Sequence, residues 1–488
     1  MTTPTLPTVL VARFLRSSNY SQTLDAFIRE AGLPADVGQA NDKESNWTIE
    51  GVLQEKTTFD QSVNFERYTD DDKEKDAWSE PAPSNPTIIQ TPTSSNLLAS
   101  SVERWTRPRD DESRDPESPA ASYIAATGAD RQLHLFQTAQ GNDLAASFSG
   151  LTDSPILSYV SVCNGRCLLM TSMSGQLVLQ RGSEVMDRRK EHTKYAVKVA
   201  VDEDVNEPWK IWAATAGWDA KIFVYCLRHP EREAEGPTRI GEPVASISLP
   251  SIPESILFVR HAESGELILL VSRRDSTYLY YYGLDSPSPS PSPSQSPSQS
   301  PSECKILGKQ NLAPHSNAWV AFSPSCLALS PHDPGLVAVA TSTLPHMKVI
   351  LARLLFPAAD SLELDPGNTA ATAEPVTQAS QAMAALALQN REDAAIHIQA
   401  NTFAPQTAYS TPQVAWRPDG SGVWVNGDDG VVRGVEARTG KVVALLKDGH
   451  AVGCKVRTIW AGWVEAPRGR EEWVVSGGFD KRLIVWRV

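Results

Sequence analysis

The strongest constraint on the fold is a strand–turn–strand element that recurs along residues 119–488 of this 488-residue chain. Three copies are clear, each with two apolar or aromatic runs around a turn that contains Asp: 123–137, 211–227 and 472–488. Four weaker copies lie between them, at 166–180, 266–283, 336–355 and 422–446. Units of this size cannot bury an apolar face alone, so neighbouring copies must stack and share a core.

Further apolar strands flank these copies. Most copies follow another strand, such as 195–202, and several precede a fourth, such as 244–250. Seven units of four short strands predict an all-β fold, a seven-bladed β-propeller.

The last copy ends at Val488, which would leave an open edge of unpaired backbone groups. Two earlier segments, 86–93 and 96–106, are candidates to close the ring. One would pair beside the last strand, and the other would be the inner strand of the first blade. We expect the earlier segment to provide the closing strand.

The repeats resemble the WD-repeat family, whose blades hydrogen-bond a His, a Ser or Thr, a turn Asp and a Trp to one another. The last copy matches with His450, Ser476, Asp480 and Trp486, and the third unit with His192, Thr215, Asp219 and Tyr225. In the first unit Asp130 and Phe136 fit, but Ala126 stands where the hydroxyl is expected. Asp275 and Asp429 occupy turns without the full set.

These four residues, which we call the tetrad, are of types that suit a structural role. A buried Asp is costly unless hydrogen bonds satisfy its oxygens, and linked His, Ser and Trp donors do so. A catalytic triad would use the same side chains. The resemblance instead places the Ser inside a blade, and no sharp strand-to-helix elbow presents it to solvent. We therefore expect loss of Asp480 to destabilise the last blade.

Residues 9–33 resemble a LisH motif, which consists of two short helices joined by a tight turn. Phe14 and Leu15 match its aromatic–Leu pair, and Tyr20, Thr23, Phe27 and Glu30 match the remaining pattern. Asn19 replaces the usual Gly, and Asn tolerates a left-handed turn. Two such helices cannot bury their apolar faces alone. The resemblance implies a homodimer; docking onto the propeller is the alternative. The expected dimerisation residues are Val11, Phe14, Leu15, Tyr20, Leu24, Phe27 and Ile28.

Together with these resemblances, the sequence predicts three regions. Residues 7–39 form the LisH motif, 40–85 an acidic and largely disordered linker with a short helix near 46–56, and 86–488 the propeller. Two insertions within the propeller, 286–303 and 357–392, are expected to be disordered, although part of the second could form a short helix. The Ser-Pro repeats of the first insertion read as a spacer or as phosphorylation sites.

Several function classes find no support in the sequence. The formal net charge of −13 does not suit direct nucleic-acid binding. No phosphate loop, zinc spacing or paired catalytic carboxylates occur, so we expect no cofactor, no metal and no small-molecule substrate. We expect no membrane segment and no secretory signal. Six scattered Cys suit a reducing compartment, the cytoplasm or the nucleus.

The sequence thus predicts a non-enzymatic scaffold that dimerises through LisH and binds protein or peptide partners on the propeller face. One alternative is a substrate receptor of a ubiquitin ligase, since Arg228 stands where some such propellers carry Trp-Asp-x-Arg. Another is a transcriptional corepressor or microtubule-associated regulator. An enzyme built on a propeller would show perturbed ionisable groups in a central pocket.

Overall fold

The computed structural model describes residues 6–39, 48–49, 78, 81–106, 121–139, 141–203, 207, 209–228, 238–261, 264–284, 302–314, 322–357, 378–466 and 469–488. The chain divides into two compact units, Met1–Thr69 and Asp70–Val488. The short helix expected near 46–56 lies almost wholly outside the described residues.

The N-terminal unit is a pair of helices, α1 (Leu6–Ser17) and α2 (Ser21–Ala31). Asn19 between them has a φ of 58°, the left-handed conformation that Asn tolerates. Gly32 ends α2 in the same conformation, and the Leu33 N–H donates to the Ile28 carbonyl at 3.0 Å. The expected helix–turn–helix is confirmed.

A short segment after α2 completes the core of this unit. Val37 packs against Ala12 and Leu24, all three of them buried. The Arg16 guanidinium holds the segment in place by donating to the carbonyls of Ala35 and Val37, each at 3.2 Å. The helix pair therefore buries part of its apolar surface within one chain.

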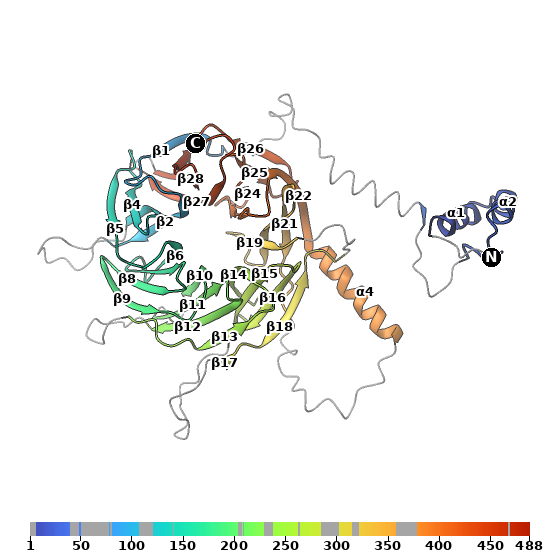
Figure 1. The fold of residues 1–488 in the computed structure, drawn as a ribbon, viewed down its shortest axis with the longest axis horizontal. Coiled ribbons are helices and arrows are strands. Elements are labelled where there is room, and N and C mark those ends of the chain that lie inside the picture. Colours follow the sequence, from blue (N-terminus) through green and yellow to red (C-terminus); the bar gives the residue numbers. More distant parts are fainter. Residues whose placement is uncertain are drawn as a thin grey trace, which may run out of the picture. The chain divides into compact units, whose positions relative to one another are not determined.

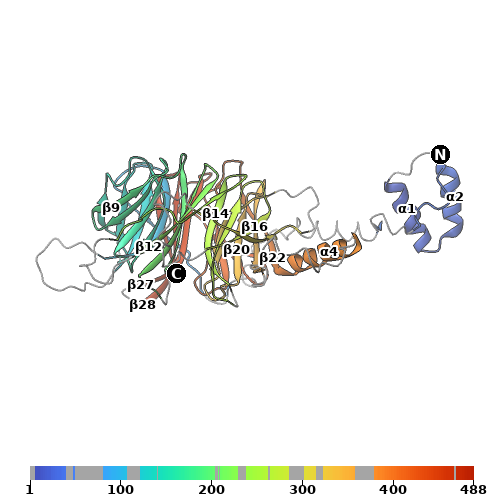
Figure 2. The ribbon, with the colours of Figure 1, turned by 90° about the horizontal axis from the view of Figure 1, so that it is seen from below.

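The second unit is a seven-bladed β-propeller, in which each blade has four antiparallel strands, with a fifth strand added in blade 3, and the blades surround a central axis (Figures 1 and 2). Blade 1 contains β2 (Leu97–Trp105), β3 (Ala121–Gly128), β4 (Leu133–Gln137) and β5 (Leu144–Phe148). Blade 2 contains β6 (Ile156–Val162), β7 (Cys167–Ser172), β8 (Leu177–Arg181) and β9 (Glu184–Arg189). Blade 3 contains β10 (Ala196–Glu203), β11 (Lys210–Gly217), β12 (Lys221–Arg228), β13 (Ala245–Ser248) and a fifth strand, β17 (Ser302–Glu303).

The remaining blades follow the same order. Blade 4 contains β14 (Pro253–Arg260), β15 (Leu267–Arg273), β16 (Tyr278–Gly283) and β18 (Ile306–Asn311). Blade 5 contains β19 (Pro324–Leu329), β20 (Leu336–Thr341), β21 (His346–Arg353) and β22 (Ile396–Pro405). Blade 6 contains β23 (Val414–Trp416), β24 (Gly422–Val425), β25 (Val432–Glu436) and β26 (Val442–Leu446). Blade 7 contains β27 (Val456–Ala466), β28 (Gly469–Gly478), β29 (Leu483–Arg487) and β1 (Asn85–Ile89).

Apolar clusters fill the spaces between neighbouring blades. One cluster joins Leu169 and Leu179 of blade 2 to Ile211 and Tyr225 of blade 3, and each of these side chains is buried. The middle strands are apolar on both sides because each sheet is covered by a neighbour on both faces. Stacking of the repeats therefore provides the core that no blade could form alone.

The ring closes through the N-terminal part of the propeller, as expected. Strand β1 pairs antiparallel with β29, with Thr87 opposite Val485 and Ile89 opposite Leu483. Strand β2 is the inner strand of blade 1. Ile89 packs in a cluster that joins Val485 of blade 7 to Phe136 of blade 1. The closing strand thus covers an edge that would otherwise be open.

Three expected boundaries need correction. Residues 378–392, predicted to be disordered, belong to the helix α4 (Gln378–Ala395), where Ala-rich and Leu-rich sequence favours a helix. Ser302 and Glu303 form β17, which runs parallel to β13, because the free edge of blade 3 offers hydrogen bonds. Trp78, placed in the linker, is 9% exposed and belongs to the propeller core. Of the rest of these three segments, the structure describes residues 48–49, 81–85 and 357.

Candidate functional site

Four blades share a Gly-x-Asp turn between their second and third strands. The turn residues are Asp130, Asp219, Asp429 and Asp480, each two positions after a Gly. In every case the Asp Oδ1 accepts the N–H of the residue two positions later, at 3.2–3.3 Å. The residue directly after each Asp has a positive φ, as a tight turn of this kind requires.

The Gly of this turn is needed for space. A Cβ at Gly217 would lie 2.2 Å from His192 Nδ1 and 2.5 Å from Asp219 Oδ1. At Gly478 it would lie 2.6 Å from Asp480 Oδ1 and 2.9 Å from His450 Nδ1. The Gly-x-Asp spacing is therefore a signal for the buried Asp network that the sequence reasoning missed.

The structure brings the four predicted residues of blade 7 together in one chain of hydrogen bonds. Trp486 Nε1–H donates to Ser476 Oγ at 2.9 Å, and Ser476 Oγ lies 2.9 Å from His450 Nε2. His450 Nδ1 lies 3.1 Å from both oxygens of Asp480. All four side chains are buried inside the blade, so the set stabilises the turn and presents no nucleophile to solvent.

Blade 3 brings its predicted residues together in the same way. His192 Nδ1 lies 3.0 Å from Asp219 Oδ1, and its Nε2 lies 2.9 Å from Thr215 Oγ1. Tyr225 replaces the Trp and is 1% exposed. Burial raises the pKa of Tyr225, against a lowering hydrogen bond with Thr215, so the phenol stays protonated.

Blades 1 and 6 satisfy the turn Asp by a different route. His134 Nε2 lies 3.2 Å from Asp130 Oδ2, and the Arg433 guanidinium donates to both oxygens of Asp429. Both partners stand four residues after the Asp, on the third strand. Thr93, from the segment between β1 and β2, also donates to Asp130. Asp275 of blade 4 lacks the preceding Gly, and its turn has no such set.

The charges of the network follow from these contacts. Burial opposes ionisation of Asp480, but hydrogen bonds from His450 and from the Ala451 N–H outweigh it and lower the pKa of Asp480 to about 2. The pKa of Asp219 is also lowered, because the bonds from His192 and the Thr193 N–H outweigh its burial. Both side chains are therefore carboxylates at neutral pH.

These turns lie on one face of the propeller, together with the loops that lead into the inner strands; we call it the turn face. The middle residue of the turn points outward, and Trp218 and Phe479 are each 42% exposed there. Tyr195 stacks beside Trp218 with ring centroids 5.0 Å apart. Further exposed apolar side chains lie in loops of this face: Leu344, Tyr409 and Val452. We call these six residues the apolar rim.

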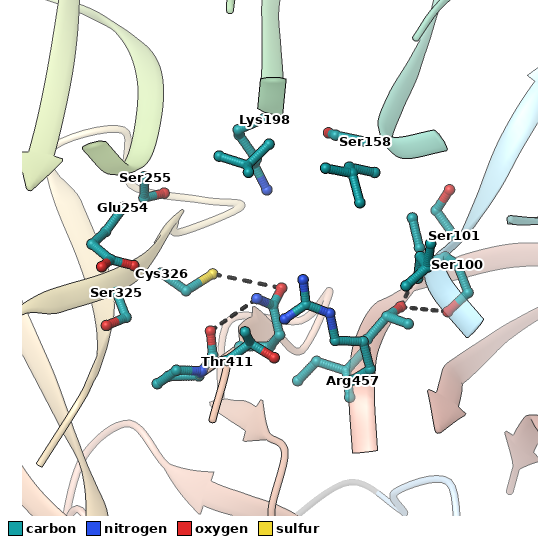
Figure 3. A pocket seen from close by; sticks show the side chains of 18 of the residues that line it. Ser100, Ser101, Ser158, Lys198, Glu254, Ser255, Ser325, Cys326, Thr411 and Arg457 are labelled. Atoms are coloured by element: carbon teal, nitrogen blue, oxygen red, sulfur yellow. Dashed lines mark hydrogen bonds between the residues drawn. The ribbon is translucent and has the colours of Figure 1, made fainter. Parts of the chain in front are cut away.

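A cavity of about 290 Å³ lies at the axis of the propeller (Figure 3). Six inner strands and the loop before the seventh, β23, contribute to its lining, most of them with their first residues. Trp218, Arg274 and Ser410 from the turn face also line it. The cavity is therefore reached from the turn face, next to the apolar rim.

The charged groups of the cavity fall into two kinds. Arg274 Nε donates to Glu254 Oε1 at 2.6 Å, and Glu103 accepts from Ser101 Oγ at 2.8 Å and from the Ser161 N–H at 3.2 Å. Burial raises the pKa of Glu103 despite these bonds. Lys198 and Arg457 instead extend into the cavity, and no described residue pairs with either (Figure 3).

Two family models match separate parts of the chain. The one described as UCP007778, LisH domain, matches residues 8–35. The one described as UCP007778, beta-propeller domain, matches residues 319–487.

The chain thus combines a LisH domain with a β-propeller. No curated protein matches it. The combination of a LisH domain and a β-propeller is typical of non-enzymatic interaction proteins.

The LisH residues expected at a dimer face divide into two groups. Leu24 is 6% exposed and lies in the core of its own helix pair, with Leu15, Phe27 and Ile28 packed around it. Val11 and Phe14 are half-buried, and Tyr20 is 55% exposed with its ring 6.4 Å from that of Phe14. Phe14 and Tyr20 thus offer aromatic surface that one chain leaves open.

The remaining residues and site types considered from the sequence contribute nothing to the candidate site. Arg228 is exposed at the end of β12, on the face opposite the turns, and its role as an adaptor contact stays a prediction. The six Cys form no disulfide. Among the described residues no group of three His, Cys, Asp or Glu could hold a metal ion. Within the same ranges, no helix combines the length and apolar character needed to cross a bilayer.

Proposed function

We propose that this protein is an interaction scaffold that takes a protein or peptide partner on the turn face of its propeller and pairs with a second copy through LisH. The observation that carries the proposal is the apolar rim. Six exposed apolar or aromatic side chains gather on one face, beside a cavity. Aromatic residues held on a rigid frame are typical of binding hot spots.

The buried Asp networks explain how such a surface is kept rigid. Asp219 and Asp480 fix the turns whose middle residues are Trp218 and Phe479. A side chain presented by a turn of fixed geometry loses little conformational freedom when a partner binds. The tetrads therefore support binding indirectly, by positioning the rim.

Pairing through LisH would add a second turn face to the same particle. Two linked sites raise the apparent affinity for a repeated or dimeric partner without any new contact. We also propose that the chain is non-enzymatic and acts in the cytoplasm or the nucleus.

Affinity purification from the native cell tests the rim. The full chain would be compared with a Trp218→Ala, Phe479→Ala double variant, after chemical cross-linking. We expect capture of the specific partner to fall at least tenfold, because both anchors of the turn face are removed. Binding of the purified partner, measured by calorimetry, should fall in parallel.

Trp463→Ala provides the matched control. Trp463 is 39% exposed, close to the 42% of Trp218, but lies toward the β27–β28 hairpin end, away from the turns. The control should capture the partner as well as the wild type. Equal loss in both variants, or no loss in the double variant, would place the partner elsewhere.

A further inference from the structure

We propose that the axial cavity is an anion site, in which Lys198 and Arg457 bind a phosphate-type oxyanion that enters from the turn face. The proposal goes beyond the scaffold function, because it assigns a ligand chemistry to the axial cavity, which shares only Trp218 with the apolar rim. The anion is either free in solution or carried by a partner as a phosphorylated side chain.

The cavity contains a pair of unmatched cations. Lys198 lies near the start of β10 and Arg457 is the second residue of β27, and both side chains extend into the same cavity (Figure 3). No described residue forms a hydrogen bond or ion pair with either. Burial lowers the pKa of Arg457, with no neighbouring carboxylate to offset the cost. Two like charges at one site favour an anion between them.

The other charged groups of the lining do not neutralise this pair. Glu254 and Arg274 neutralise each other. Glu103 accepts hydrogen bonds from Ser101 and from the Ser161 N–H. The lining therefore carries a net positive charge, in a chain whose formal net charge is −13. A local excess of cations in an acidic protein is a feature that needs a counter-charge.

Hydroxyl groups of the lining have protons to donate. Ser158 Oγ accepts the Val199 N–H at 3.3 Å, and Ser255 Oγ accepts the Leu327 N–H at 3.2 Å. Neither hydroxyl donates its own proton to a described residue, so each can donate to an anion. Hydroxyl donors with one Lys and one Arg match an oxyanion that has several acceptor oxygens.

The cavity has room for such a ligand. A volume of about 290 Å³ corresponds to roughly ten water molecules at about 30 Å³ each. A hydrated phosphate group therefore fits without any movement of the blades. Trp218 and Arg274, at the mouth, lie where the remainder of a phosphorylated side chain would pass.

Thermal unfolding of the full chain tests the site. The unfolding midpoint would be followed as sodium phosphate replaces sodium chloride at constant ionic strength. We expect a saturable rise for the wild type, because a ligand that binds only the folded state stabilises it. Arg457→Gln and Lys198→Gln should each weaken phosphate binding at least tenfold. Phosphate also stabilises proteins without a site, and that part remains in the variants.

Arg438→Gln is the matched control, because Arg438 is a surface cation with a side chain 88% exposed. It should keep the wild-type response. Without phosphate, Arg457→Gln should be at least as stable as the wild type, since an unmatched charge is removed. A purely structural Arg457 would give the opposite result.

A second measurement avoids variants altogether. Phosphate should slow acetylation of Lys198 in the wild type, measured by mass spectrometry, while the exposed Lys481 reacts at an unchanged rate. No protection of Lys198, together with equal phosphate responses in wild type and variants, overturns the proposal.

O-phosphoserine identifies the source of the anion. The binding considered is the part that Lys198→Gln or Arg457→Gln abolishes. If it is tighter for O-phosphoserine than for phosphate, the anion is carried by a phosphorylated partner. If it is equal or weaker, the anion is free in solution. Serine itself should not bind. The measurement contains no partner protein, so a failure here leaves the rim proposal standing, and a failure of the rim variants leaves the anion site standing.

Discussion

At the scale of single residues, a hydrogen-bonded carboxylate organises each Gly-x-Asp turn, and in blades 3 and 7 its side chain is almost fully buried. The carboxylate accepts the N–H two residues later in all four blades, and only its second partner varies: His450 and His192 from loops, His134 and Arg433 from the third strand. The requirement is that the charge be satisfied, and several side chains can do so. The turn is therefore more constant than the tetrad around it.

Asp480→Asn should destabilise the propeller by about 2 kcal/mol, the range for losing hydrogen bonds to a charged group. The folded-state pKa of Asp480, about 2, lies below its ordinary 3.8. A depressed pKa stabilises the fold above the ordinary value, and this contribution is lost as pH falls through the folded one. The stability of the wild type should thus fall more steeply than that of the variant between about pH 4 and pH 2.

Urea unfolding at a series of pH values measures this difference. Asp275→Asn is the control, because Asp275 occupies a turn of blade 4 without a preceding Gly or a His partner. Its effect on stability should be small. A pH profile of Asp480→Asn that parallels the wild type would contradict the assigned role.

At the scale of elements, the segment before β2 closes the ring at two points. Strand β1 completes blade 7, and Trp78 packs on blade 6, with its ring 5.1 Å from that of Trp424. The Arg417 guanidinium lies 4.4 Å over Trp78 and donates to Glu472 of blade 7 at 2.6 Å. The closing segment thus joins the last two blades as well as the first and the last.

Ile88 and Ile89 are neighbours in β1 but differ in burial. Substituting each in turn therefore separates the effect of burial from that of strand pairing. Ile89 is 5% exposed within the cluster between blades 7 and 1, and Ile88 is 45% exposed on the other side of the strand. Ile89→Asp should release β1, expose the β29 edge and cost roughly 3 kcal/mol or more, since a charge enters an apolar cluster. Ile88→Asp should be nearly neutral.

Hydrogen exchange with mass spectrometry checks this prediction. Amide protons of residues 483–487 should exchange faster in Ile89→Asp than in Ile88→Asp, and the Ile89 variant should aggregate on heating. Equal protection in the two variants would mean that the ring stays closed without β1.

At the scale of the whole molecule, the LisH unit and the propeller are separate folded bodies with different surfaces to offer. The helix pair buries Leu24 internally and leaves Tyr20 exposed beside Phe14. The propeller offers the apolar rim and the cavity. A scaffold of this design would combine self-association at one unit with partner binding at the other.

Light scattering tests the proposed self-association. The full chain should have twice the mass of one chain, and a chain that starts at residue 40 should have the mass of a monomer. Phe14→Ser should give a monomer with its propeller intact, because the open aromatic surface is lost. The same monomeric mass for the full and the shortened chain would refute the dimer.

The sequence predicted the features that depend on the spacing of residues within one repeat. The repeats gave the propeller, and fixed offsets placed His450, Ser476, Asp480 and Trp486 in one network. Contacts between distant segments were not predicted: Thr93 on Asp130, and Trp78 on blade 6. Neither contact leaves a periodic pattern, because each is made once and by a segment that no repeat contains.

The sequence by itself determined the number of blades, the helix–turn–helix at Asn19 and the composition of the buried networks, because strand period and turn chemistry act within a single unit. Only the tertiary structure decided which side chains meet at the axis. Lys198 and Arg457 stand in different repeats, and neither residue is unusual in its own strand. They share a cavity because ring closure brings every inner strand to the same axis, and that closure depends on the pairing of β1 with β29.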